Sequence, residues 1–102
     1  MSKLQIETLV KAALQSLNLP VELPKIIIET PKDSQHGDFA TNVALMLSKA
    51  VKENPRQLAE KIIKALPESH LIAKTEIAGP GFINFFLTPN ALHEVIPQIL
   101  DL

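Results

Sequence analysis

Residues 76–87 read EIAGPGFINFFL, two apolar runs separated by Gly79-Pro80-Gly81. The runs are short and apolar, and glycine and proline between them favour a turn. The stretch therefore predicts two strands, 70–78 and 82–87, joined as a hairpin or bulged turn. Alternate side chains of a strand point to opposite faces. The second strand thus has one face with Ile83, Phe85 and Leu87 and another with Phe82, Asn84 and Phe86.

Asn84 is the unexpected residue in this stretch. Asparagine is depleted in strands and costs free energy when it is buried without hydrogen-bond partners. One interpretation is an aromatic core strand whose amide is satisfied by the backbone. The other is a binding face, because an unstacked nucleobase can lie on a ring while an adjacent amide reads its edge. Composition alone favours neither interpretation.

The composition indicates one soluble domain over residues 1–102. There is no cysteine, which excludes disulfides and thiolate metal sites and favours a reducing compartment. Ten basic and eleven acidic residues give a net charge of −1, so no basic stripe is available for nonspecific binding of nucleic acid. No signal peptide or membrane-spanning stretch is recognisable, and we expect a cytoplasmic protein.

The remaining elements follow from hydrophobic periodicity and capping residues. We expect helices over 3–17, 39–51 and 55–66, with Asp38 and Asn54 as the N-caps of the second and third. Residues 25–30 are β-branched and predict a strand. A last helix begins near Thr88 and is interrupted at Pro97. The result is an α+β domain of two layers, with helices on one face of a small, mostly antiparallel sheet. Phe82, Asn84 and Phe86 would lie on the open face.

Candidate catalytic and metal-binding residues are few. His36-Gly37-Asp38 could belong to an acid–base site, but Asp38 is explained more simply as an N-cap and Gly37 as a turn residue. The histidines lack metal-ligand spacing, and no phosphate-binding loop is present. Five lysines could line a phosphate-binding surface but are more simply solvated: Lys49, Lys52, Lys61, Lys64 and Lys74. We expect no catalysis, metal or cofactor in this chain alone.

Three segments taken together carry a family resemblance. Residues 36–42 (HGDFATN), 54–59 (NPRQLA) and 77–85 (IAGPGFINF) resemble, in order and spacing, the N-terminal additional domain of bacterial arginyl-tRNA synthetases. The resemblance covers nearly the whole chain. It implies a helix–strand–strand–helix–strand–strand core (α-β-β-α-β-β), which requires a second strand around 32–38 or an extended start near Phe39.

The resemblance also implies a site. In that family an aromatic residue and an asparagine contact the D-loop nucleotide at position 20 on the outer corner of tRNA, and Phe82 and Asn84 match them. Some members carry tyrosine at the position of Phe82, so this chain has only the stacking contact there. The other matched positions read as a structural motif: Gly37, Asp38, Asn42, Gly79, Pro80 and Gly81.

By the same resemblance, the chain is a domain of a larger synthetase that forms arginyl-tRNA from arginine, ATP and tRNA(Arg). The family's catalytic and anticodon-binding segments are absent from residues 1–102. The implied partners are the D-loop of tRNA(Arg) and the rest of the synthetase, and we expect the fragment to be a monomer that binds tRNA weakly. The alternative is a structural or protein-contact module. Reading of tRNA predicts that Phe82 and Asn84 are both exposed to solvent.

Overall fold

The structure is a computed structural model that describes residues 3–89. The elements within this range, in chain order, are α1 (Lys3–Ser16), the 3₁₀ turn η1 (Ser34–His36), β1 (Phe39–Thr41), α2 (Val43–Val51), α3 (Pro55–Ala65), β2 (Ile72–Ala78) and β3 (Phe82–Leu87). The predicted last helix, with its interruption at Pro97, falls outside the described residues.

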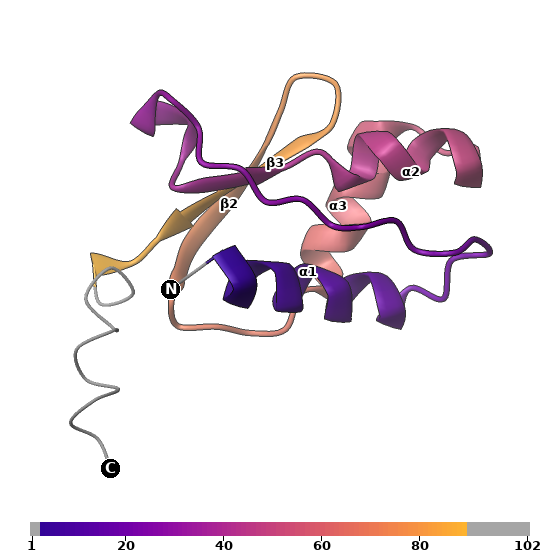
Figure 1. The fold of residues 1–102 in the computed structure, drawn as a ribbon, viewed down its shortest axis with the longest axis horizontal. Coiled ribbons are helices and arrows are strands. Elements are labelled where there is room, and N and C mark those ends of the chain that lie inside the picture. Colours follow the sequence, from indigo (N-terminus) through magenta and orange to yellow (C-terminus); the bar gives the residue numbers. More distant parts are fainter. Residues whose placement is uncertain (1–2, 90–102) are drawn as a thin grey trace, which may run out of the picture.

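The strands form one antiparallel sheet in the order β1-β3-β2, so β3 is central (Figure 1). The hairpin expected from the glycine-proline-glycine turn is confirmed, with β2 beginning at Ile72. In Figure 1 the helices gather on one side of the sheet, and α1 lies across α3. The α+β class with an antiparallel sheet is therefore confirmed.

The core lies between this sheet and the helices. Ile83 and Phe85 of β3 are fully buried and Leu87 is 8% exposed, which confirms the predicted apolar face. The helices contribute the residues at helical spacing that face inward, chiefly Ile6, Val10, Leu14, Val43, Leu47, Leu58 and Ile62. Within residues 3–89 the helices thus pack against the face of β3 that carries Ile83 and Phe85.

The predicted start of the second helix is wrong. Residues 39–41 form β1, which pairs with β3 through Phe39–Phe85, Ala40–Asn84 and Thr41–Ile83, and the helix begins only at Val43. Asp38 is therefore not an N-cap. The apolar pattern fits a helix locally, but pairing with the central strand satisfies the backbone of these residues and outweighs that preference. The extended start near Phe39 that the family resemblance requires is observed.

The predicted strand 25–30 is reduced to one bridge. Glu29 exchanges two backbone hydrogen bonds of 2.8 Å with Ala40, and the rest of the segment makes no regular ladder. Ile26 and Ile28 are buried while Ile27 is 48% exposed, so the three isoleucines are not buried on both sides. The segment is extended, and Glu29 is the single residue of it that pairs with the outer edge of β1.

Gly37 and Asp38 attach the loop before β1 to the end of β3. The Asp38 N–H donates to the Phe85 carbonyl at 2.8 Å, and Asp38 Oδ2 accepts from the Leu87 N–H at 2.8 Å. Gly37 has φ 95° and ψ −174°, a region that residues with a side chain almost never occupy. A Cβ there would lie 2.7 Å from the Phe85 carbonyl oxygen. Glycine is therefore required by both the backbone conformation and the close approach.

Gly37→Ala should lower the free energy of unfolding by about 3 kcal/mol, because backbone strain and overpacking each cost about 1–3 kcal/mol. Gly79→Ala is the matched control: Gly79 has φ 54° and nothing within 4 Å of the added Cβ. It should cost about 1 kcal/mol. Urea unfolding of the two variants measures both values. Equal losses would show that contact with Phe85 does not restrict residue 37.

Candidate nucleic-acid interface

The face of the sheet away from the helices is built from cross-strand rows of residues. Directly opposed residues of antiparallel strands place their side chains on the same face. Asn84 lies opposite Ala40 on one side and Glu76 on the other, and Glu29 lies beyond Ala40. One row of the face therefore reads Glu29, Ala40, Asn84, Glu76.

Small residues make part of this face concave. Phe82 lies opposite Ala78 of β2, and Asn84 lies opposite Ala40 of β1, so each of the two side chains has a methyl group as its cross-strand neighbour on one side. A groove of about 430 Å³ opens over them. The groove is lined by Glu29, Pro31, His36, Ala40, Ala78, Gly79, Pro80, Phe82 and Asn84. The two residues singled out from the sequence thus lie together in one groove.

Asn84 is buried, contrary to the expectation that it is exposed. It is 5% exposed and lies between Ala40 of β1 and Glu76 of β2. Within residues 3–89 its side-chain amide makes no hydrogen bond, although its backbone belongs to the central strand. A buried polar group without a partner costs about 1–3 kcal/mol. The amide therefore keeps both its donor and its acceptor available to a ligand in the groove.

Phe82 and Phe86 differ in their surroundings although they share this face. The Lys74 ammonium lies 4.5 Å from the centroid of the Phe86 ring and also pairs with Glu76 at 3.0 Å. Both rings are partly buried, and neither is among the described residues that pack against the hydrophobic core. One ring is thus covered by a cation from its own sheet, whereas the other lines the groove.

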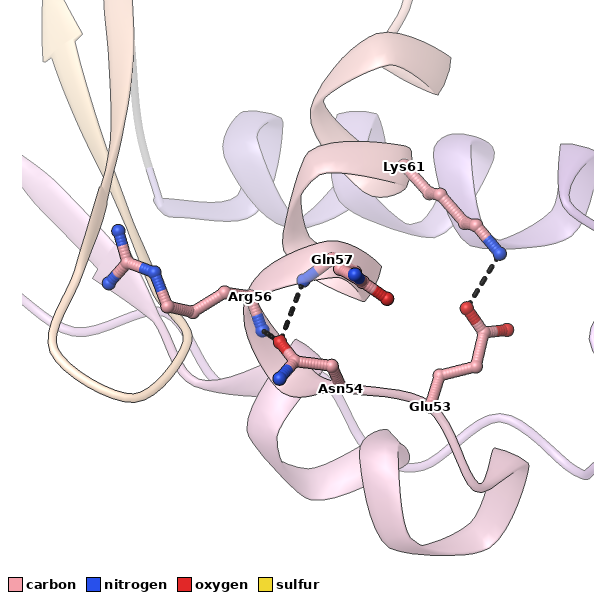
Figure 2. A network of polar contacts seen from close by, with 5 residues as sticks. All are labelled: Glu53, Asn54, Arg56, Gln57 and Lys61. Carbon is pink, nitrogen blue, oxygen red and sulfur yellow. Dashed lines mark hydrogen bonds and ion pairs between the residues drawn. The ribbon is translucent and has the colours of Figure 1, made fainter.

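The turn that closes the groove is held by the start of α3. Gly81 has φ 146°, and a Cβ there would lie 2.8 Å from the Pro55 Cβ. Arg56 donates from Nη1 to the Gly79 carbonyl, and Figure 2 shows its side chain extended toward the β2–β3 turn. The 54–59 and 77–85 segments of the sequence therefore meet in space, with glycine required at position 81 by the approach of Pro55.

The beginning of α3 is itself fixed by its N-cap (Figure 2). Asn54 Oδ1 accepts from the backbone N–H of Arg56 at 2.9 Å and of Gln57 at 3.2 Å, which confirms the predicted cap. Lys61 pairs with Glu53 at 2.6 Å on the exposed side of the helix. Lys61 and Lys74 are thus paired with carboxylates of their own surface, which agrees with ordinary solvated positions.

The other motif residues lie outside the groove or beside it. The Asp38 carboxylate is engaged by the Leu87 N–H, and no hydrogen bond joins it to His36 among residues 3–89. His36 instead lines the groove. Asn42 is the residue before α2, but its side chain makes no capping hydrogen bond.

Sequence reasoning missed Glu29, His36 and Ala40 as residues of the groove. Each comes from a segment far along the chain from β3, so no local pattern connects them with Asn84. Within the described range no cluster of three or more potential ligands for a metal is found. The helices of residues 3–89 include none long and apolar enough to cross a membrane.

Comparison with known proteins identifies what the chain is similar to. Residues 4–87 match the family model described as the arginyl tRNA synthetase N terminal domain. The arginine–tRNA ligase of Listeria welshimeri is 48% identical over 97 residues, covering 93% of this chain and 17% of the relative. That of Coxiella burnetii strain RSA 331 is 52% identical over 103 residues, covering 96% and 18%. The chain thus spans less than one fifth of the length of these relatives.

Solved structures agree on the fold. The arginyl-tRNA synthetase of Plasmodium falciparum superposes with a TM-score of 0.80 at 18% identity, over 95% of this chain and 18% of that one. The Thermus thermophilus arginyl-tRNA synthetase gives a TM-score of 0.77 at 21% identity, over 93% and 15%. Similarity at these identities concerns the fold alone.

Asn84→Val should raise the free energy of unfolding by about 1 kcal/mol, because it removes an unsatisfied amide from a strand and introduces a better strand former. Thr41→Val is the matched control, since the Thr41 hydroxyl donates to the Ile27 carbonyl at 3.0 Å. That change should lower the free energy of unfolding by about 1 kcal/mol. Urea unfolding compares them. Destabilisation by Asn84→Val would mean that the amide has a partner within the folded chain.

Proposed function

Since the chain belongs to the family of arginyl tRNA synthetase N terminal domains, we propose that it binds tRNA(Arg), with Phe82 and Asn84 contacting a nucleotide of the D-loop. The observation that carries this proposal is the buried amide of Asn84, which has no side-chain partner among residues 3–89 and lines the same groove as the Phe82 ring. A base would stack on the ring, and the amide would donate to its edge and accept from it.

The charge of the groove favours a base over a phosphate. Among residues 3–89 its lining contains no lysine or arginine, while Glu29 contributes a carboxylate. Affinity from phosphate contacts depends on neutralising cations and falls with salt. Stacking is worth about 1–3 kcal/mol per base without a basic surface. The domain would therefore add a selective contact to a complex whose affinity comes mostly from elsewhere.

The function of the whole protein is proposed from the same membership. The larger chain would be a cytoplasmic arginine–tRNA ligase that joins arginine to tRNA(Arg) with ATP. In this proposal the present domain uses no cofactor and performs no chemical step. The remaining parts of the synthetase chain would activate arginine and supply the other tRNA contacts.

Phe82→Leu and Asn84→Ala in the full-length synthetase should each raise the KM for tRNA(Arg) about tenfold, because stacking and base-edge contacts are each worth about 1–3 kcal/mol. The KM values for arginine and ATP should not change. Phe86→Leu is the matched control on the same strand and face, and it should change the KM for tRNA less than twofold. Steady-state aminoacylation measures all of these constants.

A structural or protein-contact role gives a different result in this assay. The two variants would then lower thermal stability or dissociate the domain, with no selective change in the KM for tRNA. Equal effects of Phe82→Leu and Phe86→Leu on tRNA use would likewise contradict the assignment of the groove.

A further inference from the structure

Glu29 is fixed opposite the proposed base-reading amide by its backbone. Its N–H and carbonyl both bond to Ala40 at 2.8 Å, and Ala40 is paired with Asn84. The Glu29 carboxylate and the Asn84 amide therefore belong to one row on one face, with only the Ala40 methyl group between them. Two strand spacings place their Cα atoms about 10 Å apart. A planar ring above Ala40 can thus be reached from both sides.

The two carboxylates of this row differ in their partners. Glu76, on the far side of Asn84, is paired with Lys74 at 3.0 Å. Glu29 is exposed and lines the groove, and no ion pair or side-chain hydrogen bond to it is found within residues 3–89. Among the described residues that line the groove, His36 is the only one with a basic side chain. The Glu29 carboxylate is therefore free to accept hydrogen bonds from a ligand.

A carboxylate accepts hydrogen bonds and repels phosphate. We propose that Glu29 is a specificity-determining residue whose carboxylate accepts a hydrogen bond from the nucleotide held by Phe82 and Asn84. This inference rests on the proposed function of the groove. The donor is either an exocyclic amino group of the base or the ribose 2′-hydroxyl, which share the chemistry of an N–H or O–H facing an anion. Asn84 alone would hydrogen-bond to one edge of the base. Glu29 would select for a donor group on the opposite side of the nucleotide.

The test uses the full-length synthetase and steady-state aminoacylation of tRNA(Arg) transcripts. Glu29→Ala should raise the KM for tRNA about tenfold, since a hydrogen bond to a charged group is lost. Glu29→Gln should raise it less, because one acceptor oxygen remains. Glu76→Gln is the matched control and should change it less than twofold. The KM values for arginine and ATP should stay constant, and thermal unfolding should show that each variant is folded.

Modified tRNAs identify the donor. One transcript carries a 2′-deoxyribose at the D-loop nucleotide, and another carries a base without its exocyclic amino group. The proposal expects one modification to raise the KM of the wild-type enzyme and to have no further effect in Glu29→Ala. Independent effects of Glu29→Ala and both modifications would overturn it, because the contact would not be direct.

Failure of this inference is distinguishable from failure of the groove assignment. If Phe82→Leu and Asn84→Ala raise the KM for tRNA while Glu29→Ala does not, only the role of Glu29 is refuted. If none of the three variants affects the KM for tRNA, the proposed function itself is refuted.

Discussion

The pairing of β3 on both of its edges is the constraint on which the rest of the structure depends. As the central strand it aligns β1 and β2, and its fully buried Phe85 anchors the hydrophobic core. The same residue accepts the Asp38 N–H at its carbonyl and leaves room at that oxygen only for a glycine at position 37. The loop before β1 is thus fixed by the backbone of β3.

The two faces of β3 have opposite effects on the stability of the fold. The burial of Ile83 and Phe85 away from water stabilises the folded state, as expected of a strand packed on helices. On the other face Asn84 is buried without a side-chain partner among residues 3–89, a cost that an apolar residue at this position would avoid. The stabilisation from the buried hydrophobic core offsets the free-energy cost of the Asn84 amide. This amide in the groove is the observation on which the proposed function rests.

Local patterns predicted the parts of the fold that local interactions form. The β2–β3 hairpin and the Asn54 cap of α3 involve residues close in sequence, and both were predicted correctly. The apolar pattern of Phe39 to Thr41 continues into α2 and therefore predicts a helix for this segment. Its strand partners lie more than 40 residues away, and the Asp38–Leu87 hydrogen bond spans 49 residues. No window of the sequence contains that information.

The sequence by itself determined the alternation of β3, and with it the side chains that share a face, because a strand has a period of two residues. Its motifs also indicated the family, and through that resemblance Phe82 and Asn84 as candidate site residues. Only the tertiary structure decided that Asn84 is buried with no side-chain partner in the described part of the chain, that Lys74 covers Phe86, and that Ala40 leaves a groove bordered by Glu29. These properties depend on which distant segments become neighbours of β3, and that choice is made by strand pairing and core packing across the whole chain.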